Sequence, residues 1–317
     1  MLLLGLDVPP PSAADVPASP LARAAVRLAL AGFRRMPEAT RTAVAGAMGR
    51  LAFALGIRRR VTLDNLAAAF PAWSAVERRA VARRTYGNMA RAALEAVLGA
   101  RQPPADLGAS VVSDELRTID RALTAGRGAL VVTAHLGSWE VLGAELTRRG
   151  VPLHAVVRPL SGAFNAEVVA ARVRSGLRLI PARGALPAAL AALRRNEVVT
   201  VLLDQAVGGR HALFVPFFGR PAATTPLVSV AALRSGAPVF LALAPREEGR
   251  LRLRVEGPFP VPSTGNWRQD VWTHTAELTA ALERAIREHP DQWLWLHRRW
   301  KVPPGAAPDV TMGVPER

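Results

Sequence analysis

The stretch ALVVTAHLGSWE, residues 129–140, decides how the middle of this chain of 317 residues folds. Its first part, Ala129 to His135, is a short apolar run rich in valine, as expected for a buried strand. Ser138 is placed to cap a following helix, which we expect to end at Gly150. The strand therefore ends at the histidine, and Glu140 falls in the first turn of the helix.

The chain after this stretch continues to alternate short apolar segments with amphipathic ones. Expected strands cover residues 151–157, 177–181, 198–203, 238–245 and 251–256, and expected helices cover 163–175, 186–195 and 271–288. We expect the last two strands to be antiparallel. This alternation predicts an α/β fold with a mostly parallel central sheet and helices on both faces.

The first third of the chain has a different pattern. Residues 1–20 predict a flexible leader, and residues 21–105 predict a helical region with helices near 21–33, 42–57 and 75–100. The first two helices are apolar with arginines along them, which suits helices that lie at a membrane interface. Packing in the core is the alternative, and the apolar pattern alone leaves both open.

The composition is strongly basic, with a net charge of +16. Such a charge favours anionic partners, namely acidic lipid headgroups, nucleic acid or an acidic carrier protein, although the general richness in arginine explains part of it. No segment has the ~18–20 uninterrupted apolar residues of a membrane-spanning helix, and we expect no signal peptide. The chain has no cysteine, which excludes disulfides, thiolate metal sites and cysteine nucleophiles.

His135 and Glu140 are the strongest candidates for chemistry. The carboxyl edge of a parallel sheet is where α/β proteins bind ligands, and His135 stands at that edge. A histidine held by a carboxylate is a general base with a fixed tautomer. The alternative is structural: Glu140 only complements the helix dipole, and His135 is an ordinary histidine at a strand end.

Motifs of other enzyme classes are missing from the chain. It has no GxSxG elbow, no HExxH, no Walker GxxxxGK[ST] and no GxGxxG. A serine hydrolase, a zinc enzyme and a nucleotide-binding fold therefore have no motif in their favour. A lone histidine base without a protein nucleophile suits direct attack by a substrate hydroxyl on an activated carbonyl, with no metal or cofactor.

HLGSWE resembles the HFGNWE-type motif of the bacterial lipid A biosynthesis (lauroyl/myristoyl) acyltransferases, a branch of the lysophospholipid acyltransferase superfamily. Leu136 and Ser138 depart from the usual Phe and Asn, and neither change removes a catalytic group. Further blocks resemble the family in the same order, over about residues 40–301: Asn65-Leu66 with Ala69-Phe70-Pro71, Tyr86 to Met89 with Glu95, Arg158-Pro159 with Asn165 and Arg172, Leu203 to Gln205 with Val215 to Gly219, and Gln292 to Lys301.

The resemblance implies the α/β sandwich of the glycerolipid acyltransferases over residues 106–301, followed by a tail over 302–317. It implies that His135 is the general base and Glu140 the residue that orients it. We expect backbone amides at the start of the next helix, or an arginine, to stabilise the oxyanion. The side chains expected to bind substrate are Trp139, Arg158, Arg172, Asp204, Gln205, Phe217 and Phe218.

Several of these residues have a second interpretation. Arg158 and Arg172 suit oxyanion or phosphate contacts, or ordinary salt bridges. Phe217 and Phe218 are a wall for an acyl chain, a loop that dips into a membrane, or core residues. The histidines other than His135, including His297, lack an acid at useful spacing and are interpreted as structural or surface residues.

The expected function is transfer of a fatty acyl chain from acyl carrier protein or coenzyme A to a hydroxyl of a membrane lipid, such as a lipid A precursor. Another acceptor, namely a lysophospholipid, a glycolipid or a phosphatidylinositol mannoside, is the alternative within this class. The alternative of another class is a non-catalytic basic protein that binds membrane or nucleic acid, and nucleic acid is not expected. The expected location is the cytoplasmic face of the bacterial inner membrane, with peripheral or monotopic attachment.

Overall fold

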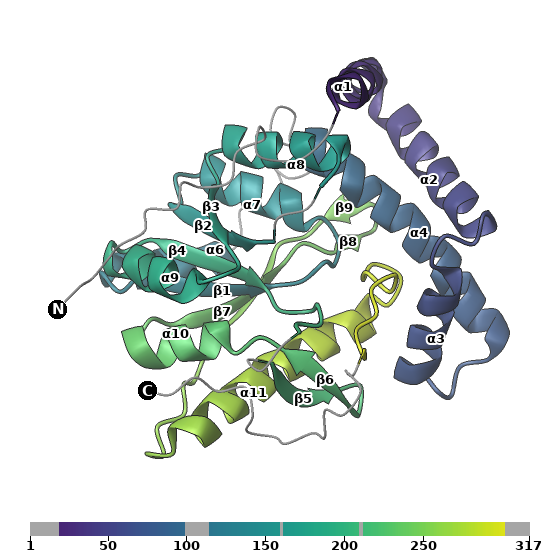
Figure 1. The fold of residues 1–317 in the computed structure, drawn as a ribbon. Coiled ribbons are helices and arrows are strands. Elements are labelled where there is room, and N and C mark those ends of the chain that lie inside the picture. The colour runs from purple at the N-terminus through teal and green to yellow at the C-terminus, as the bar shows by residue number, and fades with distance from the viewer. Residues whose placement is uncertain (1–18, 99–113, 159–160, 209–211, 302–317) are drawn as a thin grey trace.

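The computed structural model describes residues 19–98, 114–158, 161–208 and 212–301 (Figure 1). The predicted tail over 302–317 lies outside the described residues, as does the predicted leader except for its last two positions.

Four helices form the N-terminal region, seen in purple and blue at one end of the molecule (Figure 1). Two of them begin at capping residues that the sequence supplies. The Ser19 side chain accepts a hydrogen bond from the Ala22 N–H at 3.1 Å, and Ser74 and Glu77 bond each other's backbone N–H groups in a capping box. The helices are α1 (Pro20–Arg35), α2 (Glu38–Ala54), α3 (Arg59–Ala69) and α4 (Ala75–Leu98).

The N-terminal helices bury one side and expose the other. Leu30 and Phe33 of α1 are buried in a cluster with the end of α4 and with Val168. On the outer side, Leu28 of α1 and Leu51 of α2 are 76% and 60% exposed. Core packing is therefore confirmed for the inner side, and attachment of the outer side to a membrane stays a prediction. Among the helices of the described residues, none combines the length and the apolar character needed to cross a membrane.

A six-stranded sheet forms the centre of the α/β part, in the order β10-β7-β1-β4-β2-β3. Every neighbouring pair is parallel except β10 with β7, which is antiparallel as expected for the last two strands. The strands are β1 (Ala129–Thr133), β2 (Leu153–Val157), β3 (Arg178–Pro181), β4 (Val198–Leu202), β7 (Val239–Leu243) and β10 (Arg254–Phe259). The sequence prediction of a mostly parallel sheet in an α/β fold is confirmed.

Helices cover both faces of the sheet, as Figure 1 shows for α7 and α8 on one side and α10 and α11 on the other. Alternate residues of β1 point to opposite faces, so that Leu130 and Val132 join one core cluster while Ala129 and Val131 join the other. The first cluster takes in α9 (Ala185–Arg194), α10 (Leu227–Ser235) and α11 (Trp267–Glu288), and the second takes in α6 (Asp114–Thr124), α7 (Trp139–Arg148) and α8 (Ala163–Arg174).

The chain leaves the neighbouring strands β1 and β4 toward opposite faces of the sheet. After β1 it enters α7 on the face of the second cluster, and after β4 it passes to α10 on the face of the first. Adjacent parallel strands whose connections diverge in this way leave a crevice at their carboxyl ends. Two hairpins lie outside the main sheet, formed by β5 (Leu213–Phe217) with β6 (Arg220–Thr224) and by β8 (Arg246–Glu247) with β9 (Arg250–Leu251).

Candidate active site

His135 and Asp204 meet at the carboxyl ends of β1 and β4. The imidazole Nδ1 lies 2.9 Å from Oδ1 of Asp204, and the backbone N–H of His135 donates to Oδ2 at 2.9 Å. The indole Nε1 of Trp293 also donates to Oδ2, at 2.8 Å. Three groups therefore contact the carboxylate: the imidazole itself, the backbone N–H of His135 and the indole of Trp293.

Asp204 is charged although it is almost completely buried. Burial raises the pKa of its carboxyl, but the neighbouring His135 and the hydrogen bonds from the histidine and Trp293 more than offset this and lower that pKa below its ordinary value. An ionised Asp204 accepts a hydrogen bond from the protonated Nδ1 of the neutral ring. The other ring nitrogen, Nε2, is then free to act as a base.

Glu140 does not hold His135, and the predicted pairing of these two residues is wrong. Its carboxylate is paired with Arg172 of α8, whose Nε donates at 2.9 Å and whose Nη2 donates to the other oxygen. It also accepts a bond from Trp139 Nε1 at 3.1 Å. The physical reason is that Asp204 already occupies Nδ1 from the adjacent strand, while a guanidinium satisfies both oxygens of Glu140 at once.

Glu140 still acts on the surroundings of His135. The Trp139 ring, whose N–H it holds, packs edge-on against the imidazole with ring centres 4.9 Å apart. Burial lowers the pKa of Arg172, but the charge of Glu140 outweighs this and raises that pKa above its ordinary value. Arg172 thus stays charged where it contacts Glu140, and the pair forms one side of the site.

Gly137 makes the turn that separates His135 from the helix. Its φ is 62°, and a Cβ built at this position would lie 2.0 Å from the carbonyl oxygen of Ala244. The N–H groups of Gly137 and Ser138 donate to the carbonyls of Gln292 and Ala244, at 3.1 and 3.0 Å. These two amides are therefore engaged, and the expectation that amides of this turn bind an oxyanion does not hold for them.

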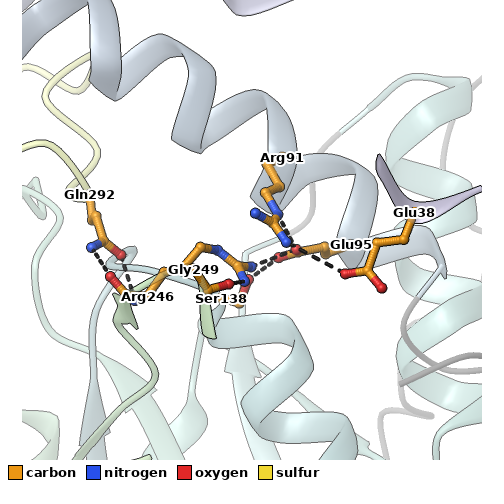
Figure 2. A network of polar contacts seen from close by, with 7 residues as sticks. All are labelled: Glu38, Arg91, Glu95, Ser138, Arg246, Gly249 and Gln292. Carbon is orange, nitrogen blue, oxygen red and sulfur yellow. Dashed lines mark hydrogen bonds and ion pairs between the residues drawn. The ribbon is translucent and has the colours of Figure 1, made fainter. Parts of the chain in front are cut away.

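Ser138 is held by a network of charges rather than by a helix cap (Figure 2). The sequence predicts that Ser138 caps α7, and this prediction is wrong. The Ser138 hydroxyl instead donates to Glu95 of α4. The same carboxylate pairs with Arg246 at 2.6 Å and with Arg91 at 2.9 Å. The Gln292 side chain in turn bonds the backbone of Arg246 through both its oxygen and its nitrogen. The turn after His135 is thus anchored to α4 and to the C-terminal segment together.

Gln205 lies close to the imidazole, and Arg158 contacts the loop that carries Gln205. The side-chain nitrogen of Gln205 is 3.4 Å from Nε2 of His135, the nitrogen that Asp204 leaves free. Arg158 reaches the same loop, where its Nη2 donates to the carbonyl of Ala206 at 3.4 Å. Both residues follow strands of the sheet, Gln205 after β4 and Arg158 after β2, and their role in binding substrate stays a prediction.

Phe217 and Phe218 are core residues here, 1% and 6% exposed. They pack with Trp293, Trp295 and Trp300 in one aromatic cluster beneath the C-terminal segment. Of the three interpretations of this pair, core packing is the one that the structure shows, and neither ring lines the apolar pocket described below.

His297 is a site residue that the sequence interpretation missed. Its Nε2 accepts a hydrogen bond from the N–H of Ala206 at 3.0 Å, so it fixes the loop that carries Asp204 and Gln205. Burial lowers its pKa to about 4, which keeps it neutral and able to accept. Its place in the segment Gln292 to Lys301, one of the quoted blocks, was the signal available in the sequence.

A narrow apolar pocket of about 40 Å³ lies between α7 and strands β1, β2 and β4. Trp139, Glu140 and Arg172 contribute to its lining, and aliphatic side chains make up most of the rest: Val131, Leu142, Leu146, Leu153, Val157, Leu177 and Leu202. Trp139 contacts both this pocket and the His135 ring. Trp139 is therefore the side chain that lies between the pocket and the imidazole.

Known proteins resemble this chain over most of its length. The family model described as bacterial lipid A biosynthesis acyltransferase matches residues 19–302. The lipid A biosynthesis palmitoleoyltransferase of Escherichia coli (strain K12) is 29% identical over 249 residues, covering 78% of this chain and 80% of that protein. The lipid A biosynthesis lauroyltransferase of the same strain is 28% identical over 266 residues, covering 82% and 85%.

The match of the family model extends over most of the chain, and it includes both the N-terminal helices and the α/β part. His135, Asp204, Gln205 and His297 all lie within it. The family model and the relatives therefore show that the protein is an O-acyltransferase. The chain belongs to the bacterial lipid A biosynthesis acyltransferase family.

Proposed function

We propose that the protein transfers a fatty acyl chain from a thioester, on acyl carrier protein or coenzyme A, to a hydroxyl of a lipid A precursor, with His135 as general base. The observation that carries the proposal is the contact of 2.9 Å between His135 Nδ1 and an ionised, buried Asp204. This contact leaves Nε2 as the basic nitrogen, and no serine, cysteine or threonine is needed as a nucleophile.

The proposed reaction has two steps. First, the acceptor oxygen attacks the thioester carbonyl while His135 Nε2 takes its proton, and Asp204 stabilises the imidazolium. Second, the tetrahedral intermediate expels the thiolate, which takes that proton and leaves as a thiol, so that His135 is neutral again. Gln205, 3.4 Å from Nε2, and Arg158 are the side chains placed to donate to the oxyanion.

The apolar pocket is the proposed site of the acyl chain. Its aliphatic lining suits methylene groups, and the Arg172–Glu140 pair closes part of its wall. The pocket is small, so we expect a long chain to displace side chains or to extend beyond it. In this arrangement Glu140 acts through Trp139 and Arg172, and its effect on catalysis is one of positioning.

We place the protein at the cytoplasmic face of the inner membrane, attached peripherally through α1 and α2. Apolar side chains are exposed along these helices: Leu21 and Leu28 on α1, Met48 and Leu51 on α2, and Leu55 directly after α2. Arg50 and Arg58 lie exposed beside them. An apolar face with a basic rim is suited to a leaflet with anionic headgroups.

Replacement of His135 by glutamine tests the proposal, because glutamine keeps a polar side chain without a basic nitrogen. We expect loss of acyl transfer by at least about a thousandfold with an unchanged circular dichroism spectrum and melting temperature. The assay is thiol release and mass-spectrometric detection of acylated lipid, with purified protein, acyl thioester and lipid A precursor. Near-normal turnover in a folded His135→Gln variant would remove the mechanism.

A further inference from the structure

A basic hollow of about 490 Å³ lies on the surface between α3, the β5–β6 hairpin and the end of the C-terminal segment. Figure 1 shows these three parts close together at one side of the molecule. Four cationic side chains line it, contributed by elements far apart in the sequence: Arg60, Arg220, Arg298 and Lys301.

The positive charge of this basic hollow is poorly compensated. Asp64 is the carboxylate in its lining, and its contact with Arg60 is long, 3.8 Å, between two exposed side chains. Within the described part of the chain, no carboxylate lies within 4.0 Å of Arg220, Arg298 or Lys301. Elsewhere arginines share acids closely, as Arg148 and Arg149 share Glu145 at 2.7 and 2.8 Å. Cations gathered in one hollow repel one another, and a bound multivalent anion relieves that repulsion.

The basic hollow backs directly onto the segment that supports the catalytic loop. Asn65, which lines the hollow, donates to the carbonyls of Trp295 and His297, at 2.8 and 2.6 Å. His297 in turn accepts from the N–H of Ala206, two residues after Asp204. The segment Trp295 to His297 therefore lies between the hollow and the loop that carries Asp204 and Gln205, and it contacts both.

We infer that the basic hollow binds a phosphate group of one of the two substrates, an inference that rests on the proposed function. A guanidinium group can donate two parallel hydrogen bonds to the oxygens of one phosphate, and Lys301 adds a positive charge on a flexible side chain. Phosphate occurs in the headgroup of a phospholipid-like acceptor and in the phosphodiester arm of a carrier-bound or coenzyme A donor. Both sources present the same chemistry, and the kinetic measurement below distinguishes them.

Direct binding tests the hollow without any acyl transfer. Inorganic pyrophosphate is titrated calorimetrically into the full-length protein, into the double variant Arg298→Gln/Lys301→Gln, and into the control Arg194→Gln/Arg268→Gln. The control removes the same charge from two exposed arginines on α9 and α11, outside the hollow. We expect pyrophosphate affinity at least tenfold weaker in the first variant and unchanged in the control. Equal affinity in all three proteins, or no binding by the wild type, overturns the proposal.

Steady-state kinetics with the same three proteins identify the substrate. An increase of KM for the acceptor alone, with kcat retained, assigns the phosphate to the acceptor headgroup. An increase of KM for the donor alone assigns it to the arm of the carrier. Unchanged KM for both substrates overturns the proposal. If the wild type transfers no acyl group, the proposed function fails, and the pyrophosphate titration still decides whether the hollow binds phosphate.

Discussion

Asp204 holds His135 twice, since one carboxylate oxygen contacts the ring Nδ1 and the other accepts the backbone N–H of the same residue, both at 2.9 Å. The imidazole and the chain that carries it are thereby fixed to the neighbouring strand end. Rotation of the ring breaks its hydrogen bond to a buried carboxylate, and the first prediction concerns this pair.

Asp204→Asn is expected to lower kcat far more than Glu140→Gln. Asparagine keeps the shape but favours the wrong tautomer of His135, and the comparable change in a serine protease triad costs about 10⁴ in kcat. Glu140→Gln disturbs only Trp139 and Arg172, so a fall of about ten- to a hundredfold is expected, as for other residues that orient a functional side chain. Steady-state rates of both variants provide the measurement. The reverse order would restore Glu140 as the partner of His135.

Gly137→Ala is expected to abolish activity and to destabilise the protein, because its Cβ would lie 2.0 Å from the Ala244 oxygen at a φ of 62°. Gly126→Ala is the matched control, since Gly126 has a φ of 71° and no atom within 4 Å of an added Cβ. The control therefore carries only the backbone cost of about 1–2 kcal/mol. Urea unfolding and the thioester assay compare the two variants. Similar behaviour of both would contradict the close packing of the catalytic turn.

His274 makes the stability of the fold depend on pH. It is fully buried and bonded to Ser229, and burial lowers its pKa from 6.5 to about 4. Between these values the unfolded chain binds a proton that the native protein does not. The free energy of unfolding therefore falls as the pH falls through this window, by about 1.4 kcal/mol per pH unit for this group.

The variant His274→Asn should show a shallower loss of unfolding free energy between pH 6.5 and 4 than the wild type, although its stability at pH 7 is lower. Ser229→Ala is the control, because it removes the hydrogen-bond partner and keeps the imidazole. Its loss of stability should be the same at both ends of the window. Urea unfolding at pH 7, 6 and 5 measures these slopes, and an unchanged slope in His274→Asn would contradict the assignment.

Leu51→Ser/Leu55→Ser is expected to weaken binding to anionic vesicles at least tenfold, because each leucine loses about 1.5–3 kcal/mol of apolar burial. Both side chains are exposed, 60% and 69%, so the fold should be unaffected. Val76→Ser, at the start of α4 and 78% exposed, is the control for a general loss of surface hydrophobicity. Vesicle sedimentation at low and high salt measures binding. Salt-independent binding, or equal binding by all variants, would exclude this docking face.

The positions of strands and helices could be predicted from the sequence better than which of them lie side by side. The strand, turn and helix of residues 129–140 follow from a valine-rich run and a histidine before Gly137, which are local signals. The partner of His135 depends on β4 lying beside β1, and the order of strands is not written in any local pattern. Glu140 was the nearest acid along the chain, and Asp204 is the nearest in space.

Other differences have equally physical causes. The β5–β6 hairpin was not expected, because Pro216 and Pro221 face each other in its register and proline is typical of loops. A two-stranded hairpin tolerates proline where no further strand pairs with it. The burial of Phe217 and Phe218 is a consequence of this hairpin, because it directs both rings into the aromatic cluster under the C-terminal segment.

The contact of Glu95 with Ser138, Arg91 and Arg246 has a consequence for how the molecule can be divided (Figure 2). A fragment that starts after α4 would keep the sheet together with His135 and Asp204, yet Arg246 would lose its contact with Glu95 and the Ser138 hydroxyl would lose its acceptor. The helices in front of the α/β part therefore support, through Glu95, the turn that follows His135.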